Sequence, residues 1–152
     1  MEHRVSHQDM DELLKQLEDD YIKAVKDNDR ATVERFIEKF LYDSWDYNEE
    51  NIDSIKYVLK RYSNGEIAQG TFSGAFNEMV DHLQAKLERL DHEKEYAVLH
   101  TDKGASLLVA FVDGLVLQYY LDVYDVEQLK EMTPYLKQVI LQALKTKGDE
   151  NQ

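Results

Sequence analysis

The chain has 152 residues, of which 43% are hydrophobic and 32% charged, with six glycines and one proline. This length and composition predict a single globular domain over residues 1–152 and exclude a disordered chain. The absence of cysteine excludes a disulfide framework and a thiol nucleophile. The formal net charge of −13 argues against direct binding to nucleic acid, because such binding depends on lysines and arginines that neutralise phosphates.

We expect neither a membrane-spanning helix nor a secretory signal. The longest apolar run, Ala105 to Leu117, is interrupted by Ser106, Asp113 and Gly114, and it is shorter than the roughly 20 residues that a bilayer requires. The first four residues lack the basic-then-apolar order of a signal peptide. These features predict a cytoplasmic protein.

Apolar residues recur at helical spacing along nearly the whole chain, beginning with an expected helix over residues 8–25 that Ser6 can cap. Asp29 is expected to cap a second helix. The apolar face of that helix consists of Val33, Phe36, Ile37, Phe40, Leu41 and Trp45. The polar residues 46–51 predict a turn, whose last residue, Asn51, would cap a third helix ending at residues 63–65.

A fourth helix is expected over residues 72–90, followed by a charged loop over residues 91–100. Residues 96–99 are the only strand-like run. Thr101 and Asp102 then open the most apolar helix, residues 105–121, which must be covered on several sides. In the last helix, Thr133-Pro134 predicts either a kink or a short helix followed by a longer one, and residues 146–152 are expected to fray. The expected fold is therefore an all-α bundle of about six helices.

Residues 104–122, GASLLVAFVDGLVLQYYLD, combine a small-residue start and a Leu- and Ala-rich run with Asp113-Gly114-Leu115. Val126-Glu-Gln-Leu129 and an amphipathic last helix follow. This pattern resembles the penultimate and last helices in the C-terminal half of TetR-type transcription regulators. Residues 6–10, and residues 57–62 followed by 72–90, are similar to the start of that half and to the helix pair over its ligand cavity.

The resemblance implies a sensor domain that binds an apolar or amphipathic small molecule. It also implies a homodimer in which the last two long helices of each subunit form a four-helix seam. The family's helix-turn-helix half is not in this sequence, so we expect no direct nucleic-acid binding by this chain alone. A stand-alone helical interaction module that pairs with an intact regulator is the alternative.

Ligand cavities in helical bundles are largely apolar and aromatic, with a few polar groups that orient the ligand. We expect the ligand to contact five residues: Trp45, Phe72, Phe76, Met79 and Phe111. The alternative for each of them is an ordinary core position, because an aromatic residue at helical spacing usually packs inside the domain.

The expected dimer interface consists of residues from the last two helices: Gly114, Leu115, Gln118, Tyr135, Leu141 and Leu144. Gly114 would let a neighbouring helix approach closely, or it packs within one subunit. Asp113 lies among apolar residues, so its carboxylate must be hydrogen-bonded, paired or shifted in pKa. It either contacts the seam or the cavity, or it accepts a bond from neighbouring backbone.

Catalytic and metal-binding motifs are not found. Glu78 and His82, like Glu88 and His92, are four residues apart and form helix-surface pairs or share a metal. His-Glu-x-x-His spacing, a Gly-x-Ser-x-Gly elbow and a phosphate-binding loop are all missing. We therefore expect no enzyme, no cofactor and no metal, and a helical metal protein using Glu78 and His82 is the least favoured hypothesis.

Overall fold

The computed structural model describes residues 7–65 and 69–147, and for residues 7–11, 59, 62, 63 and 69–76 it describes the backbone only. The described residues form six α-helices and one 3₁₀ helix and contain no strand, which confirms the expected fold class. The elements are α1 (His7–Asp27), α2 (Val33–Glu50), α3 (Ile52–Ser63), α4 (Gln69–Leu90), η1 (Ala97–His100), α5 (Gly104–Tyr120) and α6 (Val126–Lys145).

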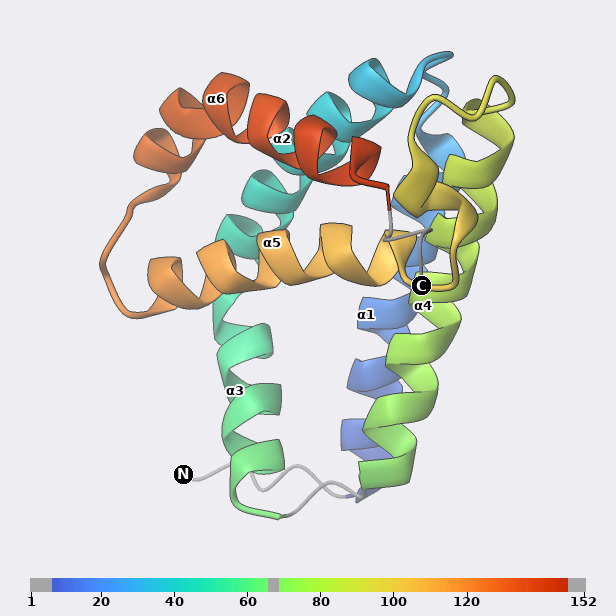
Figure 1. Ribbon diagram of the computed structural model, residues 1–152. Coiled ribbons are helices and arrows are strands. Elements are labelled where there is room, and N and C mark those ends of the chain that lie inside the picture. The colour runs from blue at the N-terminus through green and yellow to red at the C-terminus, as the bar shows by residue number, and fades with distance from the viewer. Residues whose placement is uncertain (1–6, 66–68, 148–152) are drawn as a thin grey trace.

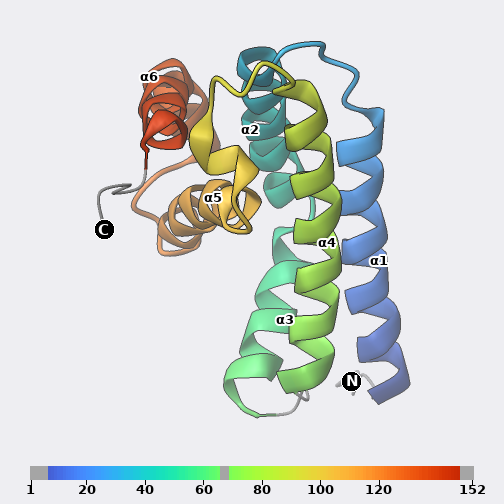
Figure 2. The ribbon, with the colours of Figure 1, turned by 45° about the vertical axis from the view of Figure 1, so that its right-hand side comes forward.

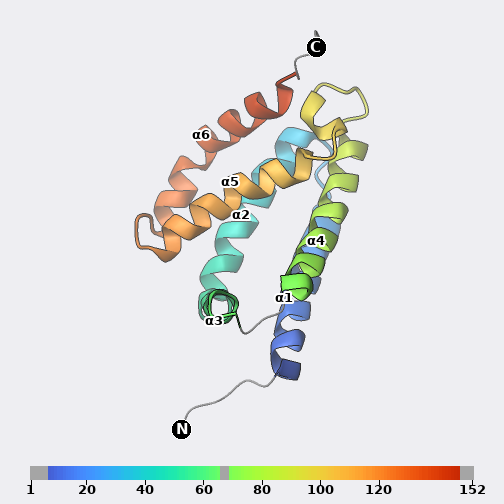
Figure 3. The same ribbon diagram turned by 60° about the horizontal axis from the view of Figure 1, so that its bottom comes forward.

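The helices are arranged around α5, which crosses the molecule. α1 and α4 lie side by side and run in the same direction (Figures 1 and 2). α2 packs along α6, and α3 continues from the end of α2 in a new direction (Figure 1). α5 contacts α2, α4, α6 and η1 (Figure 3). The last two long helices thus lie together at one side of the domain.

Two apolar clusters form the described interior. The main core joins α2, α5, α6 and η1 to parts of α1 and α4, and its fully buried side chains include Phe36, Ile37, Leu41, Trp45, Leu87, Leu108, Leu129 and Ile140. The small cluster joins α1 to α3 and consists of Leu14 and Val58 with Leu13, Leu17 and Tyr57 packed against them. The two clusters are separate, which leaves room between them.

The ends of α2 differ from the sequence prediction. Thr32, not Asp29, caps the helix, because its Oγ1 accepts a hydrogen bond from the N–H of Arg35 at 3.2 Å. The predicted turn at residues 46–51 is wrong, since α2 continues to Glu50. Asn51 ends α2 by donating its backbone and side-chain N–H groups to the Tyr47 carbonyl, each at 3.0 Å. α3 then ends at Ser63, as expected, just before Gly65 with φ of 73°.

α6 begins with a capping box that the sequence prediction missed. Asp125 accepts from the N–H of Gln128 at 2.8 Å, and the Gln128 side chain accepts from the N–H of Asp125 at 2.9 Å. The helix continues through Pro134, so its expected division into a short and a longer helix is wrong. Thr133 Oγ1 instead donates to the Leu129 carbonyl at 2.6 Å and accepts from Trp45 Nε1 at 2.9 Å.

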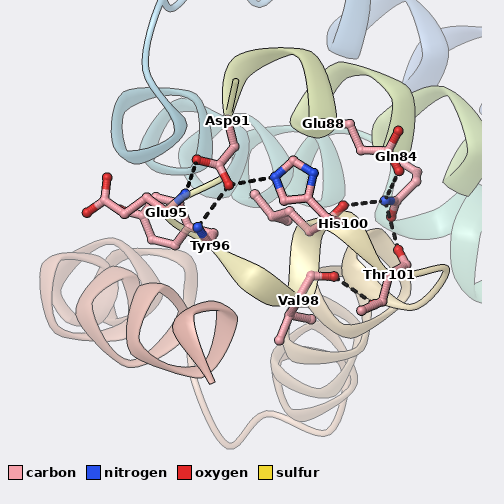
Figure 4. Close-up of polar contacts among 9 residues, drawn as sticks. Gln84, Glu88, Asp91, Glu95, Tyr96, Val98, His100 and Thr101 are labelled. Carbon is pink, nitrogen blue, oxygen red and sulfur yellow. Dashed lines mark hydrogen bonds and ion pairs between the residues drawn. The ribbon is translucent and has the colours of Figure 1, made fainter. Parts of the chain in front are cut away.

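The strand-like run at residues 96–99 lies largely in the 3₁₀ helix η1, which Asp91 holds at the end of α4 (Figure 4). The buried Asp91 carboxylate accepts from the N–H groups of Glu95 and Tyr96 at 3.0 and 2.8 Å. It also lies 2.8 Å from His100 Nε2. One acidic side chain therefore sets the path of this loop.

Gln84 joins the same loop to the start of α5 (Figure 4). Its Nε2 donates to the carbonyls of Leu99 and Thr101 at 2.6 and 3.0 Å, and its Oε1 accepts from the N–H of Ala105 at 2.8 Å. α5 begins at Gly104, where an added Cβ would lie 2.8 Å from the Leu99 Cα. Only glycine permits this close approach of η1 to α5.

Candidate functional site

A cavity of about 610 Å³ lies between the main core and the small cluster. This volume is within the range of roughly 300–1,000 Å³ that is typical of small-molecule sites. Its described lining comes from helices α1 to α5 and from Asn28, which follows α1. Apolar side chains form much of it: Leu14, Leu17, Ala24, Phe40, Ile55, Val58, Met79, Val80, Val109, Val112, Val116 and Leu117.

The charged groups of the cavity have one sign. Six carboxylates are among the described lining residues, and none of those residues is a lysine, arginine or histidine: the acids are Glu18, Asp20, Asp43, Asp46, Glu50 and Asp113. Asp43 and Asp46 form ion pairs with Lys39 and Lys130, each at 2.8 Å. Their charges are thus balanced by groups outside the lining.

Two cavity tyrosines donate hydrogen bonds to neighbouring polar groups. Tyr47 Oη donates to Asp20 at 3.0 Å, and Tyr120 Oη donates to Asn48 Oδ1 at 2.6 Å. Burial raises the pKa of both hydroxyls, and the bond to Asp20 raises the pKa of Tyr47 further. Both hydroxyls therefore stay protonated near neutral pH and keep their hydrogen atoms directed to these acceptors.

Asp113 of α5 has no balancing partner. Its carboxylate forms no hydrogen bond or ion pair with any residue that the structure describes, so the expected bond to neighbouring backbone is not present. More than a third of the residue is exposed, yet the surrounding protein displaces enough water that burial raises its pKa to about 6. Asp113 is an uncompensated acid in an otherwise apolar helix.

Tyr21 of α1 contributes a second unpartnered group. Its Oη is buried and forms no hydrogen bond with a described residue, although its ring packs edge-on against Phe40. Burial, followed by the nearby charge of Asp113, raises the pKa of this hydroxyl. Glu18, also on α1, has its pKa raised by burial and by Glu78 of α4. The α1 side of the cavity thus carries acidic and hydroxyl groups, and the cation that acts on Glu18, Lys15, lies outside the lining and pairs with Asp19.

The structure brings one of the five expected ligand contacts to the cavity, namely Met79. Trp45 is fully buried in the main core, where its Nε1 donates to Thr133, and Phe111 packs against the same core. Neither side chain is part of the cavity lining, which corresponds to the alternative of an ordinary core position. Phe72 and Phe76 belong to α4, but their side chains lie outside the described part of the chain.

The cavity tyrosines and most of its acids were not expected from the sequence. Only Asp113 could be singled out from the sequence, because a carboxylate among apolar residues must be paired, hydrogen-bonded or shifted in pKa. Tyr21, Tyr47 and Glu18 could not be, since a polar residue on an amphipathic helix usually lies in solvent. Their position at the cavity depends on how α1 and α2 pack against α5.

The residues expected at a dimer interface are divided between surface and core. Gly114 and Tyr135 are exposed, and an added Cβ at Gly114 would meet nothing within 4 Å. Leu115 and Gln118 are half-buried, whereas Leu141 and Leu144 are buried in the chain's own core. The apolar residues that α5, α6 and the segment between them leave exposed are Leu107, Leu117, Leu121, Val123, Tyr135 and Val139.

Comparison of the chain with protein-family models, curated proteins and solved structures gives no match. The similarity to TetR-type regulators therefore stays an expectation from the residues alone. Among the described helices, none has both the length and the apolar character needed to span a membrane. Within the same residues, no three His, Asp or Glu side chains are grouped so that they could hold a metal ion.

Proposed function

We propose that this chain is a small-molecule-sensing and dimerisation domain of the kind found in TetR-like regulators. The observation that carries the proposal is the cavity of about 610 Å³, which is lined mainly by apolar side chains with a few polar groups. The cavity is partly open to solvent, and its size and mainly apolar lining are typical of a small-molecule site.

The positions of the helices support a route from the cavity to a second subunit. α2 and α5 both line the cavity, and both contact α6. The opposite side of α5 exposes Leu107 and Gly114, and α6 exposes Tyr135. A ligand that favours one placement of α5 and α6 would shift the population of two dimer arrangements, provided that its affinity for them differs.

The cavity is tested with N-phenyl-1-naphthylamine, a neutral apolar dye that fluoresces when it leaves water. We expect saturable binding to the wild-type chain and at least about tenfold weaker binding to Val112→Phe, which places a ring in the cavity. Val139→Phe, an equal enlargement on the exposed face of α6, is the control and should bind as the wild type does. Equal binding to Val112→Phe would contradict the proposal.

The dimer is tested separately, by analytical ultracentrifugation. The wild type should sediment as a dimer, and Gly114→Glu should be monomeric with unchanged helicity, because the glycine has open space around it and the new charge would lie in the seam. Asn77→Glu on the exposed surface of α4 is the control for added charge. A monomeric wild type, or a fully dimeric Gly114→Glu, would refute this part of the proposal.

The second candidate is a helical interaction module that pairs with a subunit of another regulator and needs no ligand. The exposed apolar side chains Leu107, Tyr135 and Val139 favour it, because an uncovered apolar face is typical of a protein-binding surface. Under this function, Val112→Phe would retain pairing with such a subunit and Gly114→Glu would lose it. Loss of pairing in both variants would favour the sensor instead.

A further inference from the structure

We infer that the ligand of this cavity is an amphiphilic organic cation, with its charge beside Asp113 and its apolar body between α1, α2 and α5. The inference rests on the proposed function, because it specifies the chemistry of the ligand for the same cavity. It follows from three independent properties of the lining: its charge, an uncompensated carboxylate and an unpartnered hydroxyl.

The charge of the lining selects against anions. Its described residues include six carboxylates and no basic side chain, and the whole chain has a net charge of −13. Two of the acids, Asp43 and Asp46, already have lysine partners. The other four, Glu18, Asp20, Glu50 and Asp113, form no ion pair with a described residue, so the cavity has a negative potential that attracts a positive ligand.

Asp113 is where a positive charge would be stabilised most. The titratable groups that interact electrostatically with it are hydroxyls, from Tyr21 of α1 and Tyr120 of α5, and both are neutral near pH 7. From α3, Lys56 places its Nζ over the Tyr120 ring, 5.9 Å from the centroid, and forms no ion pair with Asp113. More than a third of Asp113 is exposed, so its carboxylate is only partly desolvated, and a bound cation would supply the partner that it lacks.

Tyr21 supplies an observation that is independent of charge. Its hydroxyl lies in the cavity wall, shielded from solvent and bonded to no described residue. Buried polar groups in native proteins nearly always have a partner. The Tyr21 hydroxyl is closed to a water-sized probe in the empty protein, so a ligand would supply its missing bond only with a small movement of the ring.

A matched series of probes separates charge from shape. Tetraphenylphosphonium and tetraphenylborate have nearly the same shape and opposite charge, and triphenylphosphine oxide is neutral. Calorimetric titration of the full chain should give the order phosphonium, then phosphine oxide, with no detectable borate binding. Borate binding as tight as that of the phosphonium, or phosphine oxide binding at least as tight, would overturn the inference.

Asp113→Asn tests whether this carboxylate pairs with the positive charge of the ligand. It should weaken phosphonium binding by at least about tenfold, which is the low end of measured couplings between close charges, and leave phosphine oxide binding unchanged. Asp81→Asn removes an exposed acid of α4 outside the cavity and should alter neither. Unchanged phosphonium affinity in Asp113→Asn would overturn the role of this carboxylate.

The same titrations distinguish the failure of this inference from the failure of the proposed function. If the phosphine oxide and the naphthylamine dye bind while the phosphonium has no advantage, the cavity is a ligand site but its ligand is not a cation. If none of the probes binds, both the inference and the proposed function are refuted.

Discussion

Removal of the Asp113 charge should stabilise the empty protein, and more so as the pH rises. Burial raises the pKa of this carboxyl from 3.8 to about 6, so the folded state holds its proton more tightly than the unfolded state does. Such a group does not lower the stability of the fold well below its unfolded pKa, and it lowers the stability by the full amount above its folded pKa. The gain from Asp113→Asn should therefore appear between about pH 4 and pH 6 and remain constant above that.

The magnitude follows from the size of this pKa change. A difference of about two pH units corresponds to about 3 kcal/mol at 1.36 kcal/mol each. Because more than a third of the residue is exposed to water, solvent screening reduces the expected gain to about 1 kcal/mol. Urea unfolding followed by circular dichroism at about pH 4 and pH 8 measures it, with Asp81→Asn as control. A gain of the same size at both pH values would refute the reasoning.

Three further substitutions test the fold around the cavity. Gly104→Ala should lower the free energy of unfolding by about 1–3 kcal/mol, because the added Cβ meets backbone of η1. Gly114→Ala is the control and should not destabilise the protein, since its Cβ meets open space. Equal melting temperatures for the two variants would contradict the close approach of η1 to Gly104. Thr133→Val should lower the free energy of unfolding in urea by about 1–3 kcal/mol, because it leaves Trp45 Nε1 without an acceptor. An unchanged free energy of unfolding would show that this hydrogen bond is replaceable. Asp125→Ala should cost about 1 kcal/mol in thermal unfolding as the N-cap of α6, which an unaltered melting curve would disprove.

Helical periodicity predicted the fold class and the order of the helices, because each amphipathic helix buries one face wherever it packs. Helix ends were harder to predict, since several polar residues near each end can act as caps. Asp29 and Thr32 are both suitable, and only the backbone path past Asn28 selects Thr32. Residues 46–50 are polar but remain helical because tertiary contacts hold them: Asp46 pairs with Lys130, and Asn48 accepts from Tyr120.

The site was less predictable than the fold, because spacing shows that a side chain points inward but not what it meets there. Trp45 and Met79 both lie on apolar helix faces, yet the first packs in the main core and the second lines the cavity. Asp113 was singled out by its apolar neighbours, although its lack of a partner is visible only in three dimensions. The cavity is a property of the packing between two clusters.

The single tryptophan and the three tyrosines of the cavity lining report on different parts of the molecule. Trp45 lies fully buried between α2 and α6, away from the cavity lining, whereas Tyr21, Tyr47 and Tyr120 lie within it. A ligand that only fills the cavity will alter tyrosine signals and leave the tryptophan emission unchanged. A change in tryptophan emission on ligand addition will instead show that occupancy is transmitted through α2 to α6. The protein thus carries its own reporter of coupling between the cavity and the helix proposed to meet a second subunit.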